Sequence, residues 1–156
     1  KFLAMIMDAS LHTLDIKSPA FVNGGLLPTV YRREGLNMNP GLKVQFIPSE
    51  TRSLAVVLKD VDAPVSPRIH WVCWDIPVSE WIRLNESRGI NGVNDFQLSS
   101  YTGPCVMNSR HKYFFYIYAL NVRLCLPASS PSYRFFKLIQ PHVLASGSLL
   151  FFSITD

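Results

Sequence analysis

The chain of 156 residues contains little cysteine, and its cysteines are not spaced as metal ligands or disulfide partners. Cys73, Cys105 and Cys125 are odd in number and far apart, and no Cys-x-x-Cys motif is present. These spacings argue against both the disulfide framework of a small secreted domain and a zinc site. Reduced thiols in a cytoplasm fit best, so we expect a cytoplasmic protein without a bound metal.

Charge is also sparse, because Asp, Glu, Lys and Arg make up 17% of the chain against 48% hydrophobic residues. The net charge is +4, but the basic residues are scattered and Arg32-Arg33 is their only adjacent pair. Such a surface attracts anions mildly and argues against nucleic-acid binding. The surplus of apolar residues predicts instead a ligand pocket or a subunit interface, such as that of a homodimer.

Long hydrophobic runs and glycine-rich loops are missing as well. No apolar run reaches membrane-spanning length, and the opening KFLAMIMDAS meets Asp8 too early for a clear signal peptide, so we expect a soluble protein without integral membrane association. Whether a further segment precedes this start stays open. Gly24-Gly25 and Gly103 are isolated, which argues against a Walker or Rossmann nucleotide site, and no cofactor is expected.

What the chain does contain is a series of short β-type runs, which together predict a single mainly β domain over residues 1–156. The runs LKVQF, SLAVVLKD, IHWVCWDI and KYFFYIYAL are rich in β-branched and aromatic residues and are separated by Pro and Gly. Three of them are apolar on both faces, as expected in the middle of a sandwich.

The rest of the chain predicts loops and one short helix. Residues 78–102 are rich in Gly, Asn, Ser and Asp and predict a long irregular segment with at most short strands. In PASSPSYRFFKLIQPH, Ser129 or Ser130 is the expected N-cap and Pro131 the first helical residue, with Phe135, Leu138 and Ile139 on one face. Pro141 should end this helix, and SLLFFSI should form a closing strand.

Several polar residues stand at the ends of the predicted strands. Asp60 and Asp62 end one apolar strand, and His70 begins the next, with Val72, Trp74 and Ile76 as its same-face neighbours by parity. His111 and Tyr113 likewise begin the KYFFYIYAL strand. Antiparallel neighbours would bring these ends to one edge of the sandwich, where they predict a polar pocket.

The ordered segments LAVVLKDVDAP, HWVCWDIP, YTGPC, HKYFFYIYAL and PHVLA resemble the phosphatidylethanolamine-binding protein (PEBP) family, most closely its bacterial, Raf-kinase-inhibitor-like branch of YbhB/YbcL type. The segments SPAFVNGGLLPTVY and NMNPGLKVQFIPSETRSLAVVL agree, so the likeness covers nearly the whole chain. It implies a β-sandwich of a large and a small antiparallel sheet with one or two short helices, one near the C-terminus. It also implies an anion pocket at one end for phosphate-like groups.

The same resemblance implies the residues of that pocket. They are Asp60, Asp62, His70, Tyr101, Gly103, Pro104, His111 and Tyr113. The chain departs from the family pattern at Val61, Val106-Met107, Ser109 and Lys112, where the family carries Pro, Pro-Pro, Gly and Arg. Fewer prolines should leave the loop over residues 105–110 more mobile or differently shaped, which affects ligand size more than ligand charge.

These residues suit an anion site. Imidazoles can donate hydrogen bonds and gain a proton near pH 6 to 7, and backbone N–H groups after Gly103 can add an anion-accepting concavity. Asp60 would orient an imidazole rather than touch the anion. Asp62 is read either as a ligand contact or as a turn-stabilising acid.

The sequence therefore predicts a non-enzymatic binding protein for a phosphate-like anion or phosphorylated small ligand, and the resemblance adds kinases or other signalling proteins as partners. Two alternatives stay open. One is a small hydrolase or phospho-transfer helper with a His/Asp pair and Cys105 or Ser109 as nucleophile. The other is a scaffold whose pocket no longer binds.

Overall fold

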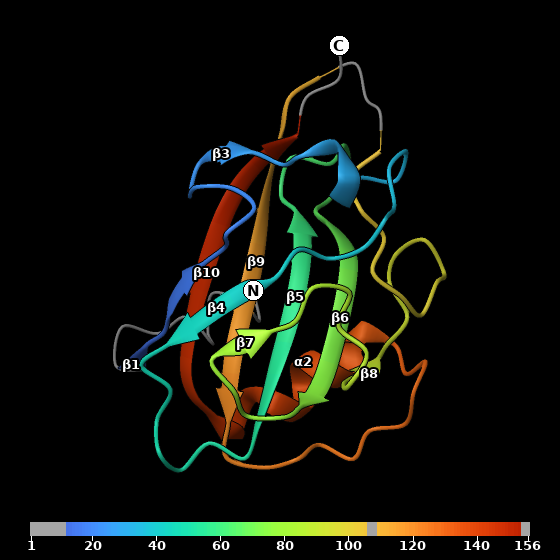
Figure 1. The fold of residues 1–156 in the computed structure, drawn as a ribbon. Helices are drawn as coiled ribbons and strands as arrows, with labels where there is room; N and C mark the ends of the chain where they lie inside the picture. The colour runs from blue at the N-terminus through green and yellow to red at the C-terminus, as the bar shows by residue number, and fades with distance from the viewer. Residues whose placement is uncertain (1–11, 106–108, 154–156) are drawn as a thin grey trace.

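Two β-sheets pack face to face in the computed structural model, which describes residues 12–105 and 109–153 (Figure 1). The large sheet consists of β1 (His12–Thr13), β3 (Gly25–Leu26), β5 (Ser53–Asp60), β6 (Arg68–Ile76), β8 (Ile90–Asn91), β9 (His111–Leu120) and β10 (Val143–Ser153). Its order is β1-β10-β9-β5-β6-β8, with β3 also beside β10. The small sheet has the order β2 (Asp15–Lys17), β4 (Leu42–Gln45), β7 (Trp81–Ile82). The mainly β prediction is confirmed.

The large sheet is mixed rather than purely antiparallel. Its central strands pair antiparallel as predicted, but β1 and β3 both run parallel to β10 along its outer edge. Each of these edge strands has only two residues, which is too short to leave a pattern in the sequence. The small sheet is antiparallel throughout.

The core forms two layers, one on each side of the large sheet. Leu58, Trp71 and Phe115 belong to the inner layer, where both sheets contribute buried side chains. On the outer face, Val57 and Trp74 pack against Phe135 of helix α2 (Ser132–Ile139). Side chains therefore cover both faces of β5, β6 and β9. The prediction of strands that are apolar on both faces is confirmed.

The helix differs from its prediction at both the cap and the buried face. Pro131 is itself the N-cap, and α2 begins at Ser132, while Ser130 donates its hydroxyl to the Pro127 carbonyl at 2.6 Å. Phe135 and Ile139 are fully buried, but Leu138 is 37% exposed. Leu138 is not part of the buried cluster on this face, so helical spacing alone overestimated its burial.

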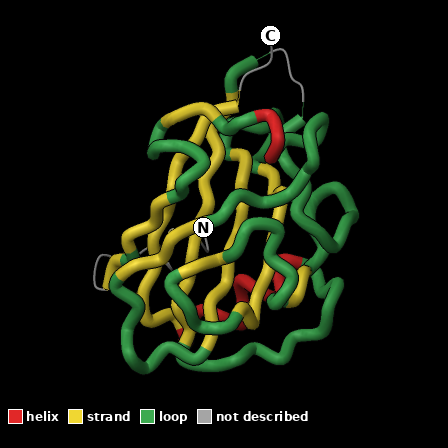
Figure 2. The backbone as a smooth tube through the Cα atoms, in the orientation of Figure 1, coloured by secondary structure: helices red, strands yellow, loops and turns green. Residues whose placement is uncertain are grey.

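The remaining segments agree with the sequence. The helix ends at Ile139, where the 3-10 turn η2 (Gln140–His142) contains Pro141 and leads directly into β10. Residues 78–102 contain only the two-residue strands β7 and β8, and they run mostly as loop along one side of the sandwich (Figure 2). A second 3-10 turn, η1 (Thr29–Tyr31), lies near the end of the sheet at which β5 finishes (Figure 1).

Candidate functional site

The predicted polar residues meet at one end of the large sheet. Asp60 is the last residue of β5, and it pairs in register with Arg68 of β6 and Tyr113 of β9. In Figure 1 this is the end at which the β5 arrow finishes, and α2 lies toward the opposite end. The three strand ends therefore lie together, as the prediction from antiparallel pairing expected.

A β-bulge turns His70 into this cluster. Leu58 pairs with Trp71 and Lys59 with Ile69, so His70 is an extra residue without a partner on β5. Its ring lies 5.2 Å from that of Tyr113, at the end of the inner layer. The prediction from the alternation of side chains along the strand was wrong here. It placed His70 on the same face as Val72 and Trp74, which belong to the outer layer.

Asp60 and His111 form a buried pair. The His111 Nδ1 atom lies 2.8 Å from Asp60 Oδ2, and the two residues are only 6% and 2% exposed. An ionised carboxylate only accepts, so the ring nitrogen carries the proton, and Nε2 is the remaining polar atom of the ring. The other oxygen, Oδ1, accepts the Asp62 N–H at 2.9 Å. Asp60 thus orients an imidazole.

Asp62 has a structural contact. Its side chain is exposed, and Oδ2 accepts the N–H of Lys112 at 2.9 Å, while the Val61 N–H bonds to the Lys112 carbonyl at 3.1 Å. These bonds tie the turn after β5 to the start of β9. Of the two readings left open by the sequence, the contacts support the structural one.

His70 is buried and its orientation is fixed. Its Nδ1 lies 2.8 Å from the Thr102 carbonyl, which can only accept, so Nδ1 carries the proton and Nε2 is the acceptor of the neutral ring. Burial lowers the pKa of His70 to about 4, although the Thr102 carbonyl and the Asp60 carboxylate partly oppose this effect. The expectation of a proton gained near pH 6 to 7 is therefore wrong for the ligand-free state of His70, which is neutral in that range.

The two tyrosines lie beneath these groups. Tyr113 is fully buried, and burial together with the nearby Asp60 carboxylate raises its pKa, so the phenol stays protonated. Tyr101 is 7% exposed, and it donates its hydroxyl to the Tyr31 carbonyl at 2.7 Å. Burial raises the pKa of Tyr101 as well. Tyr101 therefore anchors the loop that carries η1.

The Gly103-Pro104 turn packs against that loop rather than forming an open row of donors. The Gly103 N–H donates to Asn37 Oδ1 at 2.8 Å, and the Pro104 carbonyl accepts the Arg33 N–H at 2.9 Å. Pro104 has no N–H of its own. The Val106-Met107 departure lies outside the described residues, so its effect on the loop stays a prediction.

Three residues at the site had not been assigned to it from the sequence. The guanidinium carbon of Arg33 lies 4.3 Å from the ring centroid of Phe96, and that of Arg68 lies 5.3 Å from the same centroid. The Phe96 ring packs edge-on against His70, with centroids 4.8 Å apart. Two cations are thus held beside the buried imidazole by cation–π contacts. In the sequence, these cations were marked only by the adjacent pair Arg32-Arg33, which resembles ordinary surface charge.

Asn94 also supports the site. Its side-chain nitrogen lies 3.0 Å from the His70 carbonyl and 2.8 Å from Thr102 Oγ1, and it is 2% exposed. Its oxygen accepts the N–H groups of Phe96 and Leu98. Asn94 therefore joins β6 to the loop that presents Phe96, a role hidden within an Asn-rich segment.

We predict that Gly103→Ala destabilises the site by steric conflict. A Cβ on Gly103 would lie 2.4 Å from the Tyr31 carbonyl oxygen and 3.1 Å from Arg32 Cα, so the η1 loop would have to move. Overpacking of this kind costs about 1–3 kcal/mol, and urea unfolding would measure it. Gly41→Ala is the matched control, because its nearest contact is 3.7 Å. Equal unfolding midpoints for the two variants would contradict the prediction.

Two further features bear on the class of protein. Within residues 12–105 and 109–153, no group of three or more His, Cys, Asp or Glu side chains is placed to hold a metal ion. In the same part of the chain, no helix has the length and apolarity needed to cross a membrane. The molecule is thus a β-sandwich with buried, mutually oriented ionisable side chains at one end of its large sheet.

Comparison with known proteins identifies the family. Residues 17–152 match the family model described as phosphatidylethanolamine-binding protein, and the chain belongs to this family. A UPF0098 protein of Methanothermobacter thermautotrophicus is 32% identical over 146 residues, covering 88% of this chain and 96% of the relative. One of Archaeoglobus fulgidus is 31% identical over 145 residues, and the chain spans half the length of that relative.

Solved structures agree on the fold. A putative PEBP homolog from Chlamydia trachomatis superposes with a TM-score of 0.87 at 25% identity, covering 93% of this chain and 99% of the homolog. YbcL of Escherichia coli, described as a new member of the mammalian PEBP family, gives a TM-score of 0.82 at 22% identity and covers 92% of this chain and 99% of YbcL. The predicted family and sandwich are thereby confirmed.

Proposed function

We propose that this chain is a binding protein for a small ligand with a phosphate-like group, held at the sheet end formed by Asp60, His70 and His111. The observation that carries the proposal is the placement of the Arg33 and Arg68 guanidinium groups beside the buried His70. The buried Asp60 carboxylate at this sheet end is already engaged by the His111 ring and by the Asp62 N–H. An arriving anion therefore meets two cations and two oriented imidazoles.

The neutral state of His70 adds a preference among anions. Because Nδ1–H is bonded to Thr102, the ring offers only the lone pair on Nε2 unless it gains a proton. A phosphate monoester, whose second pKa is about 6, can bring that proton itself as its monoanion. Sulfate carries no proton near neutral pH. The site should thus prefer phosphate over sulfate, and more strongly as the pH falls from 8 to 6.

The hydrolase alternative makes different demands. The Nδ1 atoms of His70 and His111 are both engaged, so a base would have to act through Nε2 on Cys105, Ser109 or a water. No contact in the described part of the chain favours that arrangement over binding. The resemblance to Raf-kinase-inhibitor-like proteins extends the binding proposal to kinases or other signalling partners, whose association a bound ligand would influence.

We predict that phosphate and phosphoethanolamine raise the melting temperature at constant ionic strength, and that sulfate does so much less. A ligand at one hundred times its Kd stabilises a protein by about 2.7 kcal/mol. The His70→Ala/His111→Ala double variant should lose the response, and so should Arg33→Gln/Arg68→Gln, whose side chains are exposed and whose fold should survive. His142→Ala is the control, because β10 places His142 at the other end of the sheet.

Each other outcome has a defined meaning. If phosphate stabilises the natural chain and all variants equally, the anion binds elsewhere and the proposed site is wrong. If no form responds, the phospho-ligand proposal fails while the fold stands. Turnover of a phosphate or carboxylate ester that disappears in the double variant would favour the hydrolase.

A further inference from the structure

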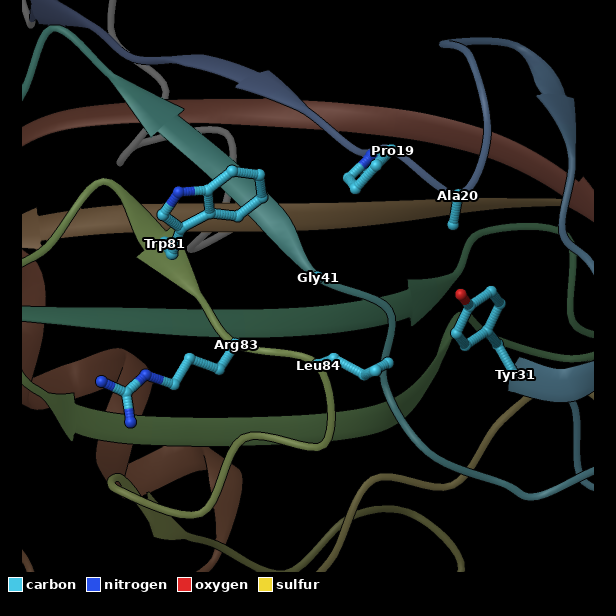
Figure 3. Close-up of a pocket in the computed structure, with 7 residues that line it drawn as sticks. All are labelled: Pro19, Ala20, Tyr31, Gly41, Trp81, Arg83 and Leu84. Atoms are coloured by element: carbon cyan, nitrogen blue, oxygen red, sulfur yellow. The ribbon is translucent and has the colours of Figure 1, made fainter.

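A cavity lies on the small-sheet side of the molecule, away from the cluster of Asp60, His70 and His111. It has a volume of about 430 Å³ and is lined by residues from four separate segments, and none of these lining residues belongs to the predicted anion site. Figure 3 shows Trp81 and Arg83 toward one end of this groove, Tyr31 and Ala20 toward the other, and Gly41 between them. The volume falls within the range of small-molecule sites.

The walls of the groove are apolar and open to solvent. Trp81 is 41% exposed and Leu84 is 52% exposed, whereas Ile82 between them is fully buried. The Tyr31 ring faces the groove from the opposite end, with its hydroxyl turned toward the groove (Figure 3). Aromatic rings contribute large contact areas at low cost in side-chain entropy, so these walls favour a ligand with an apolar body.

A buried polar network fixes the wall that carries Trp81 and Arg83. Asn39, which is 2% exposed, donates to the Arg83 carbonyl at 2.8 Å and accepts the Glu86 N–H at 2.9 Å. The Glu86 carboxylate accepts the Arg83 N–H at 3.1 Å. Arg88 completes the network with a 2.6 Å bond to Glu86 and a 3.1 Å bond to the Trp81 carbonyl. None of these groups has a part in the anion site.

The opposite wall and the floor are fixed too. The Ser18 hydroxyl donates to the Gly41 carbonyl at 2.7 Å and accepts the Ala20 N–H at 3.1 Å. The Tyr31 carbonyl is held by the Tyr101 hydroxyl. A groove whose walls are fixed before the ligand arrives loses less entropy on binding than a mobile surface does.

The charge of Arg83 determines which polar group the ligand should carry. Arg83 is the only charged residue lining the groove, and it has no ion-pair partner among residues 12–105 and 109–153. Its neighbour Arg88 is already neutralised by Glu86. A guanidinium beside an apolar groove complements a carboxylate attached to an apolar body.

We propose that this groove binds a small apolar carboxylate, with its hydrocarbon body over Gly41 and its carboxylate at Arg83. The proposal is independent of the anion site. Gly41 provides a direct test, since a Cβ there would contact nothing closer than the Leu84 nitrogen at 3.7 Å. An added Cβ therefore makes only ordinary van der Waals contacts, and a larger side chain at this position is expected to occupy the groove.

The experiment titrates the natural chain with 3-phenylpropionate and with its neutral amide, following indole N–H signals by NMR. We expect the Trp81 signal to shift, whereas Trp71 and Trp74, whose N–H groups bond to Asn91 and the Leu126 carbonyl, stay in place. Gly41→Leu should abolish binding of both compounds. Arg83→Gln should weaken the carboxylate roughly fivefold, as for an exposed ion pair, and leave the amide unchanged.

The control is Arg33→Gln/Arg68→Gln, which should lose the phosphate response and keep the Trp81 shift. Absence of any shift in the natural chain overturns the proposal, and so does binding that survives Gly41→Leu. If Gly41→Leu fails to fold, the selective effect of Arg83→Gln decides the question alone. A natural chain that is dimeric and becomes monomeric on Gly41→Leu would make the groove an interface between copies instead.

Discussion

Replacing Asp60 with alanine is expected to destabilise the protein by about 3 kcal/mol, since each buried donor left unpaired costs about 1–3 kcal/mol. The variant loses the acceptors of the His111 ring and of the Asp62 N–H, both at the end of β5. Asp60 is only 2% exposed, so water cannot easily replace the carboxylate. Urea unfolding at pH 7 would measure the loss.

Two companion variants sharpen this prediction. Asp60→Asn keeps an oxygen for the Asp62 N–H, and His111 can adopt its other tautomer to accept from the amide, so about 1 kcal/mol should be lost. Asp62→Ala removes an exposed acceptor of the Lys112 N–H and should cost less than Asp60→Ala. If Asp60→Ala proved as stable as the natural chain, the desolvation of its carboxylate would outweigh its bonds, and the pair would not hold the strand ends together.

Stability should rise by about 3 kcal/mol between pH 4 and pH 6.5 on account of His70 alone, because one pKa unit corresponds to 1.36 kcal/mol. The folded pKa is about 4 and the ordinary value is 6.5, so the unfolded chain binds the extra proton between these limits. Protonation therefore favours unfolding as the pH falls through 6.5. Above pH 6.5 both states are neutral, and this contribution to the pH dependence disappears.

Other groups titrate in the same window, so the measurement is a difference between variants. Glu86, whose pKa is lowered by hydrogen bonds from Arg88 and Arg83 against the opposing effect of burial, also loses stabilisation as the pH falls. His70→Asn keeps a donor for the Thr102 carbonyl but cannot titrate. Subtracting its urea unfolding curves from those of the natural chain isolates the His70 contribution.

His142→Asn is the control for that subtraction. It replaces an imidazole at the far end of the sheet and should keep the slope, because His70 is still present. A His70→Asn slope equal to the natural one would show that His70 titrates alike in the folded and unfolded chains. The ring would then be better solvated than its 2% exposure indicates.

The sequence by itself determined the strands that carry the site. SLAVVLKD forms β5, and KYFFYIYAL together with His111 forms β9. Both segments carry β-branched and aromatic residues on both faces of the strand, and such strands are stable only where packed layers cover both faces. Antiparallel pairing then brought Asp60 beside Tyr113. The ordered motifs also identified the family, which the comparisons confirm.

Only the tertiary structure decided how the site residues are oriented and charged. The bulge that turns His70 toward Tyr113 depends on register with β5, and the lowered pKa of His70 depends on burial by segments distant in sequence. The cations at the site are likewise placed by the single side chain of Phe96, more than twenty residues from either arginine. Such placements arise from long-range packing, which local sequence patterns do not encode, whereas strand formation follows from the local alternation and burial of side chains.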